Sequence, residues 1–103
     1  MPELPEVHTI SQDLKNNIVG FEIKNIQTAN NYRIPDDQKK KLLKLKGKKI
    51  KDSQRIAKNI VLKISENEYL VFHLAMTGRI LLRTDKDEPD KWVKIVFEIT
   101  KNN

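Results

Sequence analysis

The spacing of apolar residues predicts a helix near the start of the chain. Apolar side chains recur every three to four positions, which is the period of one helix face: Val7, Ile10, Leu14 and Ile18. Pro5 suits the first turn, where its missing N–H costs no hydrogen bond, and Gly20 provides a stop. We therefore expect an amphipathic helix of about four turns between these two residues.

The next part of the chain predicts one strand and a second helix. Phe21 and Ile23 alternate with Glu22 and Lys24 and lead to Ile26, which is typical of a half-buried strand. A polar loop from Thr28 to Ile34 follows, and Pro35 then marks a helix start. Leu42, Leu43 and Leu45 would form the apolar side of this short basic helix before Gly47 ends it.

From Lys48 onward the pattern predicts a succession of short strands separated by turn-like breaks. The expected strands are Lys49 to Ile56, Ile60 to Ile64, Tyr69 to Leu74, Arg79 to Arg83 and Trp92 to Ile99. No repeat or low-complexity linker divides the chain. These patterns indicate one α+β domain over residues 1–103, a β-sandwich of short antiparallel strands with two flanking helices.

Composition narrows the kinds of chemistry that are open to this chain of 103 residues. There is no apolar run of the ~20 residues that a membrane span needs, and the N-terminus lacks the profile of a secretory signal. We therefore expect a cytoplasmic protein with no membrane partner. The chain has no cysteine, so a disulfide, a thiol nucleophile and a cysteine zinc site are excluded. Amines, carboxylates and histidine remain.

The positive charge of the chain is concentrated in one stretch. The net charge is +6, yet residues 39–63 hold eleven Lys and Arg with Asp52 as the only anion, and the flanking parts are slightly negative. Such a stretch attracts polyanions through phosphate contacts and counterion release, which favours nucleic acid as the partner. A lysine-rich solvated surface is the alternative, and charge alone leaves both interpretations open.

The most specific motif is the opening Met1-Pro2-Glu3-Leu4-Pro5-Glu6-Val7. It resembles the start of the formamidopyrimidine-DNA glycosylase and endonuclease VIII family, whose members lose the initiator Met. The resemblance implies that Pro2 is the nucleophile, that Glu3 protonates the deoxyribose ring oxygen, and that Glu6 supports the site. An acidic residue that favours the helix dipole is the alternative for both carboxylates, and it fits Glu6 better.

Elementary chemistry supports the role that this resemblance gives to Pro2. With Met1 removed, the proline nitrogen is a secondary amine, and α-amino groups titrate near about 8, well below a lysine. Attack on the sugar C1′ displaces the base and leaves an iminium, which promotes strand cleavage by elimination. The alternative is that a small second residue merely follows a processed Met.

Two further segments resemble the same family. In Ser53-Gln54-Arg55-Ile56-Ala57-Lys58-Asn59, Lys58 occupies the position of a lysine that contacts the DNA backbone. In His73-Leu74-Ala75-Met76-Thr77-Gly78-Arg79, the resemblance implies that Met76 fills the gap left by an everted nucleotide, and that His73 and Arg79 belong to the DNA-binding set. A solvated lysine, a core methionine and a satisfied strand-end histidine are the alternatives.

The chain also departs from the family pattern. His8 stands where Glu is common, and Asp90-Lys91-Trp92-Val93 replaces a histidine-rich run. The D-x-R-x-F-G loop, the helix-two-turn-helix domain and the C-terminal zinc finger of the family are missing. The resemblance therefore implies no cofactor within this chain, and zinc only in that missing C-terminal part.

Two functions follow from the sequence. The first is a bifunctional DNA glycosylase and abasic-site lyase, acting as a monomer on double-stranded DNA with oxidised bases or abasic sites in a bacterial-type cytoplasm, at the nucleoid. We expect this stretch alone to be weak or inactive. The second is a noncatalytic remnant of the family that binds nucleic acid through its basic stretch without cutting it.

Overall fold

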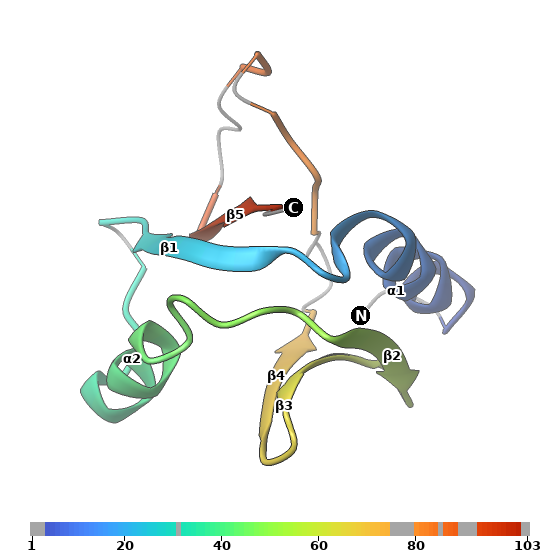
Figure 1. Ribbon diagram of the computed structural model, residues 1–103, viewed down its shortest axis with the longest axis horizontal. Coiled ribbons are helices and arrows are strands. Elements are labelled where there is room, and N and C mark those ends of the chain that lie inside the picture. The colour runs from blue at the N-terminus through green and yellow to red at the C-terminus, as the bar shows by residue number, and fades with distance from the viewer. Residues whose placement is uncertain (1–3, 31, 75–79, 85, 89–92, 102–103) are drawn as a thin grey trace.

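Figure 1 shows a computed structural model of the protein, which describes residues 4–30, 32–74, 80–84, 86–88 and 93–101. Its elements in chain order are α1 (Leu4–Ile18), β1 (Glu22–Thr28), α2 (Asp36–Leu43), β2 (Asp52–Ile56), β3 (Asn59–Ser65), β4 (Glu68–His73) and β5 (Ile95–Thr100). The strands form two antiparallel sheets, one of order β1-β5 and one of order β2-β3-β4. This confirms the predicted α+β arrangement of two helices and short antiparallel strands.

Helix α1 packs one face against the three-stranded sheet, chiefly against β2. The buried positions of this face are Val7, Ser11, Leu14 and Ile18. The predicted stripe is therefore correct except at one point, because Ser11 takes the buried position and Ile10 lies half-buried beside it. The helix ends before Gly20, whose φ of 94° is the left-handed conformation that glycine adopts without penalty.

A buried pair of hydroxyl groups joins α1 to β2. The Ser53 hydroxyl donates a hydrogen bond of 3.0 Å to the carbonyl oxygen of Ser11, and both residues are only 1% exposed. The Ser11 hydroxyl donates in turn to the carbonyl oxygen of His8 at 3.2 Å. A buried hydroxyl without a partner would be costly, so this contact favours one placement of the helix on the strand.

The two sheets are joined by the segment of residues 47–51. The Ile23 amide donates to the Lys48 carbonyl at 2.8 Å, and the Ile50 amide donates to the Phe21 carbonyl at 2.8 Å, so the segment runs antiparallel beside the start of β1. The Lys51 amide then donates to the Lys63 carbonyl at 2.7 Å, which carries the chain into the other sheet. The predicted strand from Lys49 to Ile56 is thus divided between two partners.

Apolar side chains from both sheets meet in one core. Ile23 of β1 is 0% exposed, and Ile60 and Ile64 of β3 are 0% and 2% exposed. Burying a side chain of this size contributes roughly 1.5–3 kcal/mol. Phe72 of β4 and Phe97 of β5 meet edge to face with ring centroids 5.9 Å apart, so the two sheets contact each other directly.

Three predicted elements differ from the structure. The second helix ends at Leu43, and turns continue to Gly47, because the amides of Leu45 and Lys46 bond to carbonyls three positions back, not four. The strand expected from Arg79 to Arg83 does not form in the described part, residues 80–84, where the apolar pattern meets no partner strand. The last strand begins at Ile95, and Trp92 lies outside the described residues.

The turn between β2 and β3 consists of Ala57 and Lys58. Ala57 has a φ of 53°, which makes it the one residue other than glycine with a positive φ in the described chain. The Arg55 guanidinium donates to the Ala57 carbonyl at 2.8 Å and braces this conformation. An alanine in the left-handed region costs about 1–2 kcal/mol, so the turn stores backbone strain.

We predict that Ser53→Ala lowers the free energy of unfolding by about 1 kcal/mol, because it removes one buried hydrogen bond between α1 and β2. Urea unfolding measures this change. Thr9→Ala is the matched control, since it removes an exposed hydroxyl from helix α1. It should change the free energy of unfolding by less than about 0.5 kcal/mol. Equal losses in the two variants would contradict the role assigned to Ser53.

We also predict that Ala57→Gly raises the free energy of unfolding by about 0.5–1 kcal/mol. Relief of the left-handed strain exceeds the extra entropy that glycine brings to the unfolded chain. The same substitution at Ala29, whose φ is not positive, should lower stability instead. A loss of stability in Ala57→Gly, measured in the same urea titration, would show that the turn is unstrained.

Candidate functional site

The sheet of β2, β3 and β4 brings two of the predicted DNA-binding residues together at one end. Asn59 and His73 are paired Cα partners across β3 and β4, and Lys58 precedes Asn59 in the turn. We call Lys58, Asn59 and His73 the turn end. Lys58 is half-buried and His73 is exposed, so a cation and an imidazole that are 15 positions apart in sequence lie beside each other on the surface.

A hydrogen bond fixes the ring of His73. Its Nδ1 lies 2.9 Å from the Oδ1 of Asn59, and because an amide oxygen only accepts, Nδ1 carries the hydrogen of this bond. The other nitrogen, Nε2, has no hydrogen-bond partner among the described residues. A protonated imidazole would present an N–H there, which can bind a phosphate oxygen.

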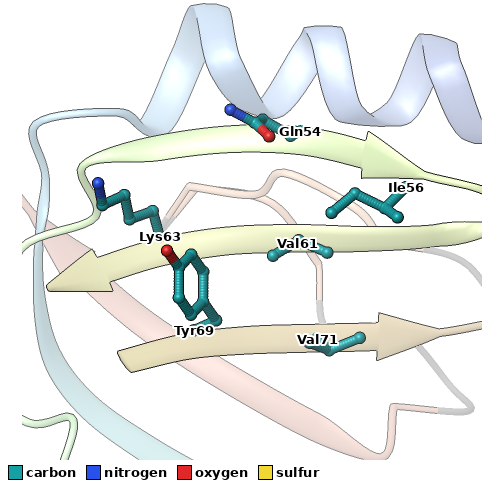
Figure 2. Close-up of a pocket in the computed structure, with 6 residues that line it drawn as sticks. All are labelled: Gln54, Ile56, Val61, Lys63, Tyr69 and Val71. Carbon is teal, nitrogen blue, oxygen red and sulfur yellow. The ribbon is translucent and has the colours of Figure 1, made fainter. Parts of the chain in front are cut away.

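Helix α1 and strand β2 run in opposite directions, so α1 begins toward the turn end. Lys15 and Asp52 form an ion pair of 3.5 Å near the start of β2, and Ser11, one turn nearer the helix start, meets Ser53, one residue further along the strand. In Figure 2, β2 points toward the side on which α1 starts. The first turn of α1 therefore lies on the side of Lys58 and His73.

In the Lys15–Asp52 ion pair near the start of β2, the carboxyl group of Asp52 has a lowered pKa. Hydrogen bonds from the Gln54 amide and the Ser53 N–H, together with the Lys15 ammonium, hold the pKa of the Asp52 carboxyl below its usual range. Asp52 is therefore ionised under ordinary conditions and neutralises part of the cationic charge beside it.

The remaining predicted site residues have different outcomes. Glu6 is exposed in the first turn of α1, where a negative charge favours the helix dipole. The other four lie outside the described residues: Pro2, Glu3, Met76 and Arg79. Their roles stay predictions. The departure at His8 is exposed on the same helix, and its backbone carbonyl accepts the bond from Ser11.

The outer face of the three-stranded sheet, which faces away from α1, carries a shallow hollow of about 480 Å³ (Figure 2). The hollow is lined by Gln54, Ile56, Val61, Lys63, Tyr69 and Val71. The ammonium group of Lys63 forms an ion pair of 3.7 Å with Glu66. Among the described residues of the lining there is no carboxylate and no imidazole, and its titratable side chains are Lys63 and Tyr69.

Neither a metal site nor a membrane span is found in the described chain. Among the residues that the structure describes, no three His, Asp or Glu side chains gather in a way that could hold a metal ion. These residues do not fit the zinc that the family resemblance assigns to a more C-terminal part. No helix in the described ranges has the length and apolar content to cross a membrane.

Sequence reasoning missed two residues of this site. Asn59 lies in the motif that contains Lys58, but the sequence assigned it no role. In the structure it orients His73 through a hydrogen bond. The register of the two strands would have suggested it, because paired positions in adjacent strands contact each other. Ser53 gave no such signal, since its partner Ser11 lies 42 positions away in a helix.

Comparisons with known proteins agree with this geometry. The family model of the formamidopyrimidine-DNA glycosylase N-terminal domain matches residues 1–103. The formamidopyrimidine-DNA glycosylase of Brevibacillus brevis is 37% identical over 102 residues, which cover 97% of this chain and 37% of that protein. The enzyme of Lactobacillus helveticus is 36% identical over 100 residues, which cover 97% and 36%.

Solved structures give the same result. The complex of Lactococcus lactis Fpg with DNA containing an abasic site has a TM-score of 0.85 at 29% identity, over 97% of this chain and 37% of that one. MutM in complex with DNA containing carbocyclic 8-oxo-G has a TM-score of 0.85 at 31% identity, over 97% and 38%. The chain spans little more than a third of the length of these relatives. It belongs to the formamidopyrimidine-DNA glycosylase family and matches the N-terminal domain of that family over its whole length.

Proposed function

We propose that this domain provides the nucleophile and part of the backbone contacts of a bifunctional DNA glycosylase and abasic-site lyase. The partner would be double-stranded DNA with an oxidised base or an abasic site. The observation that carries the proposal is the family match over residues 1–103, which includes the opening Met1-Pro2-Glu3. Relatives of similar fold bind DNA that contains a lesion or an abasic site.

The direction of α1 supports a reaction at the turn end. Helix α1 begins at Leu4, two residues after Pro2, and two residues of extended chain span at most about 7 Å. Because Ser53 and Asp52 hold α1 antiparallel to β2, the first turn of the helix lies on the side of Lys58 and His73, and we expect Pro2 to act on that side. An amine near two cationic or imidazole groups suits attack on a sugar that is flanked by phosphates.

In the proposed reaction the Pro2 nitrogen attacks C1′ of the damaged nucleotide. A bond forms between nitrogen and C1′, the glycosidic bond breaks, and its electron pair leaves with the base, which takes up a proton. Glu3 protonates the ring oxygen, so the sugar opens and a cationic iminium forms. The iminium acidifies the proton on C2′, and loss of that proton expels the 3′ phosphate and cleaves the strand.

Lys58 and His73 would hold the substrate rather than react with it. A half-buried lysine at a turn tip brings a point charge to a phosphate, while the Nε2 of His73 provides a second contact directed by Asn59. Met76 would fill the space left by the everted nucleotide, and Arg79 would join the backbone contacts.

A noncatalytic DNA-binding module is the second candidate. It is favoured by one observation, the concentration of lysines in residues 39–51, which serves binding without any need for the terminal amine. The two functions differ in a single property, since only the enzyme forms a covalent bond to the sugar.

We predict that protein with Met1 removed is trapped on abasic-site DNA by borohydride, which reduces the iminium to a stable amine. Abasic DNA needs no base pocket, so it tests the nucleophile separately from lesion recognition. The covalent complex is measured on a denaturing gel.

The matched control is the same chain with Met1 retained, in which the Pro2 nitrogen is an amide and cannot attack. Trapping should fall at least about tenfold, within the range that loss of a positioned nucleophile produces. Equal trapping by both forms would assign the attack to another amine, and no trapping by either form would favour the noncatalytic module.

A further inference from the structure

Residues 39–51, which we call the lysine segment, contain eight lysines and no acidic residue. Among the residues that the structure describes, only Lys48 of this segment forms an ion pair, with Glu68. The other seven lysines are all exposed, and within the described chain none has a carboxylate within 4.0 Å: Lys39, Lys40, Lys41, Lys44, Lys46, Lys49 and Lys51. The segment is therefore a dense positive charge, and ion pairs within the described residues leave most of it unpaired.

The lysine segment lies at the opposite end of the sheet from Lys58. Lys48 binds Glu68, the first residue of β4, and the charge of Lys44 also acts on that carboxyl. The Lys51 amide bonds to the carbonyl of Lys63 near the end of β3. Ser65, the Cα partner of Glu68, lies six residues from Asn59 along β3, so the Lys48–Glu68 pair is about 20 Å from the turn end.

Figure 1 shows the same separation, with α2 at the lower left and the arrowhead of β2 pointing to the lower right. The basic stretch of residues 39–63 is therefore two surfaces and not one. Lys58 belongs to the turn end, while the lysine segment belongs to α2 and the turns after it. A phosphate at the turn end cannot also be held by Lys40 or Lys44, because neither side chain spans that distance.

The acidic residues nearby do not balance the lysine segment. Glu66 and Glu68 are already paired, with Lys63 and Lys48 respectively. Asp36 and Asp37 lie in the first turn of α2, four positions before Lys40 and Lys41, which is a spacing that favours opposite charges. These two carboxylates offset only part of the charge, because seven lysines of the segment are exposed. The order of charges along α2 favours the helix dipole, but it leaves like charges next to one another at Lys40 and Lys44, four positions apart. A polyanion would relieve that repulsion.

We propose that the lysine segment is a second phosphate-binding surface, which binds the backbone of nucleic acid independently of the turn end. The phosphates would come either from a distant part of the same duplex or from a second duplex. The proposal rests on the proposed function only in taking DNA as the partner, and it does not require the reaction at Pro2.

The test is the salt dependence of binding to an undamaged 30-base-pair duplex, measured by fluorescence anisotropy. Gln replaces three lysines in the test variant, because it removes the charge and keeps helix propensity: Lys40→Gln, Lys41→Gln and Lys44→Gln. The slope of the logarithm of the binding constant against the logarithm of the salt concentration should become shallower by about 2.7. Each phosphate contact contributes about 0.9, and the variant loses three. Replacing the same three residues by Arg should keep the original slope.

A matched control removes the same charge elsewhere on the exposed surface: Lys24→Gln, Lys86→Gln and Lys94→Gln. This control should change the slope by less than about 1, the contribution of one phosphate contact. Lys58→Ala, combined with the test variant, should lower the slope by about one further contact, because the two surfaces act separately. Circular dichroism compares the folding of all variants.

Each outcome decides the proposal. A larger change of slope in the test variant than in the control supports it, and equal changes overturn it, because then only net charge matters. Sedimentation of the complex gives one duplex per protein if both surfaces share a duplex, and two if the lysine segment takes a second one. Borohydride trapping is measured separately, so failure of the reaction at Pro2 leaves this result unaffected.

Discussion

The arrangement of the whole site depends on how α1 lies against β2. The buried hydroxyl of Ser53 meets the carbonyl of Ser11, and the Lys15–Asp52 pair fixes the same two elements one helical turn away. Two contacts at different points define a direction as well as a position. They make α1 antiparallel to β2, so the start of α1 and the turn with Lys58 come to the same side of the molecule.

The segment of residues 47–51 gives the rest of the fold its order. Its first part bonds to β1 and its last residue bonds to β3, so it joins the sheet of β1 and β5 to the sheet of β2, β3 and β4. The same segment separates the charges. It keeps α2 and its lysines at one end of β3, while the turn end lies at the other. A continuous basic stretch in sequence thereby becomes two surfaces.

Periodicity predicted most of the elements, because burial repeats along a helix face or a strand. The helix face of Val7, Leu14 and Ile18 and the alternating strand β3 follow that rule. The position of Ser11 could not be predicted, since a serine is buried only where a partner such as Ser53 reaches it. The strand expected after residue 79 was wrong over its described part because strand formation needs a neighbour, which an apolar pattern does not reveal.

The motifs predicted the residues of the site, and the packing of the strands shows which of the described ones lie close together. Strand register places His73 beside Asn59 and Lys58, a proximity that the motifs alone did not contain. The most direct measurement of the central claim is peptide mapping of protein trapped on abasic DNA by borohydride. After digestion of protein and DNA, mass spectrometry locates the sugar remnant. We predict the adduct on the peptide that begins with Pro2. An adduct on Lys58 or on a lysine of the segment 39–51 would contradict it.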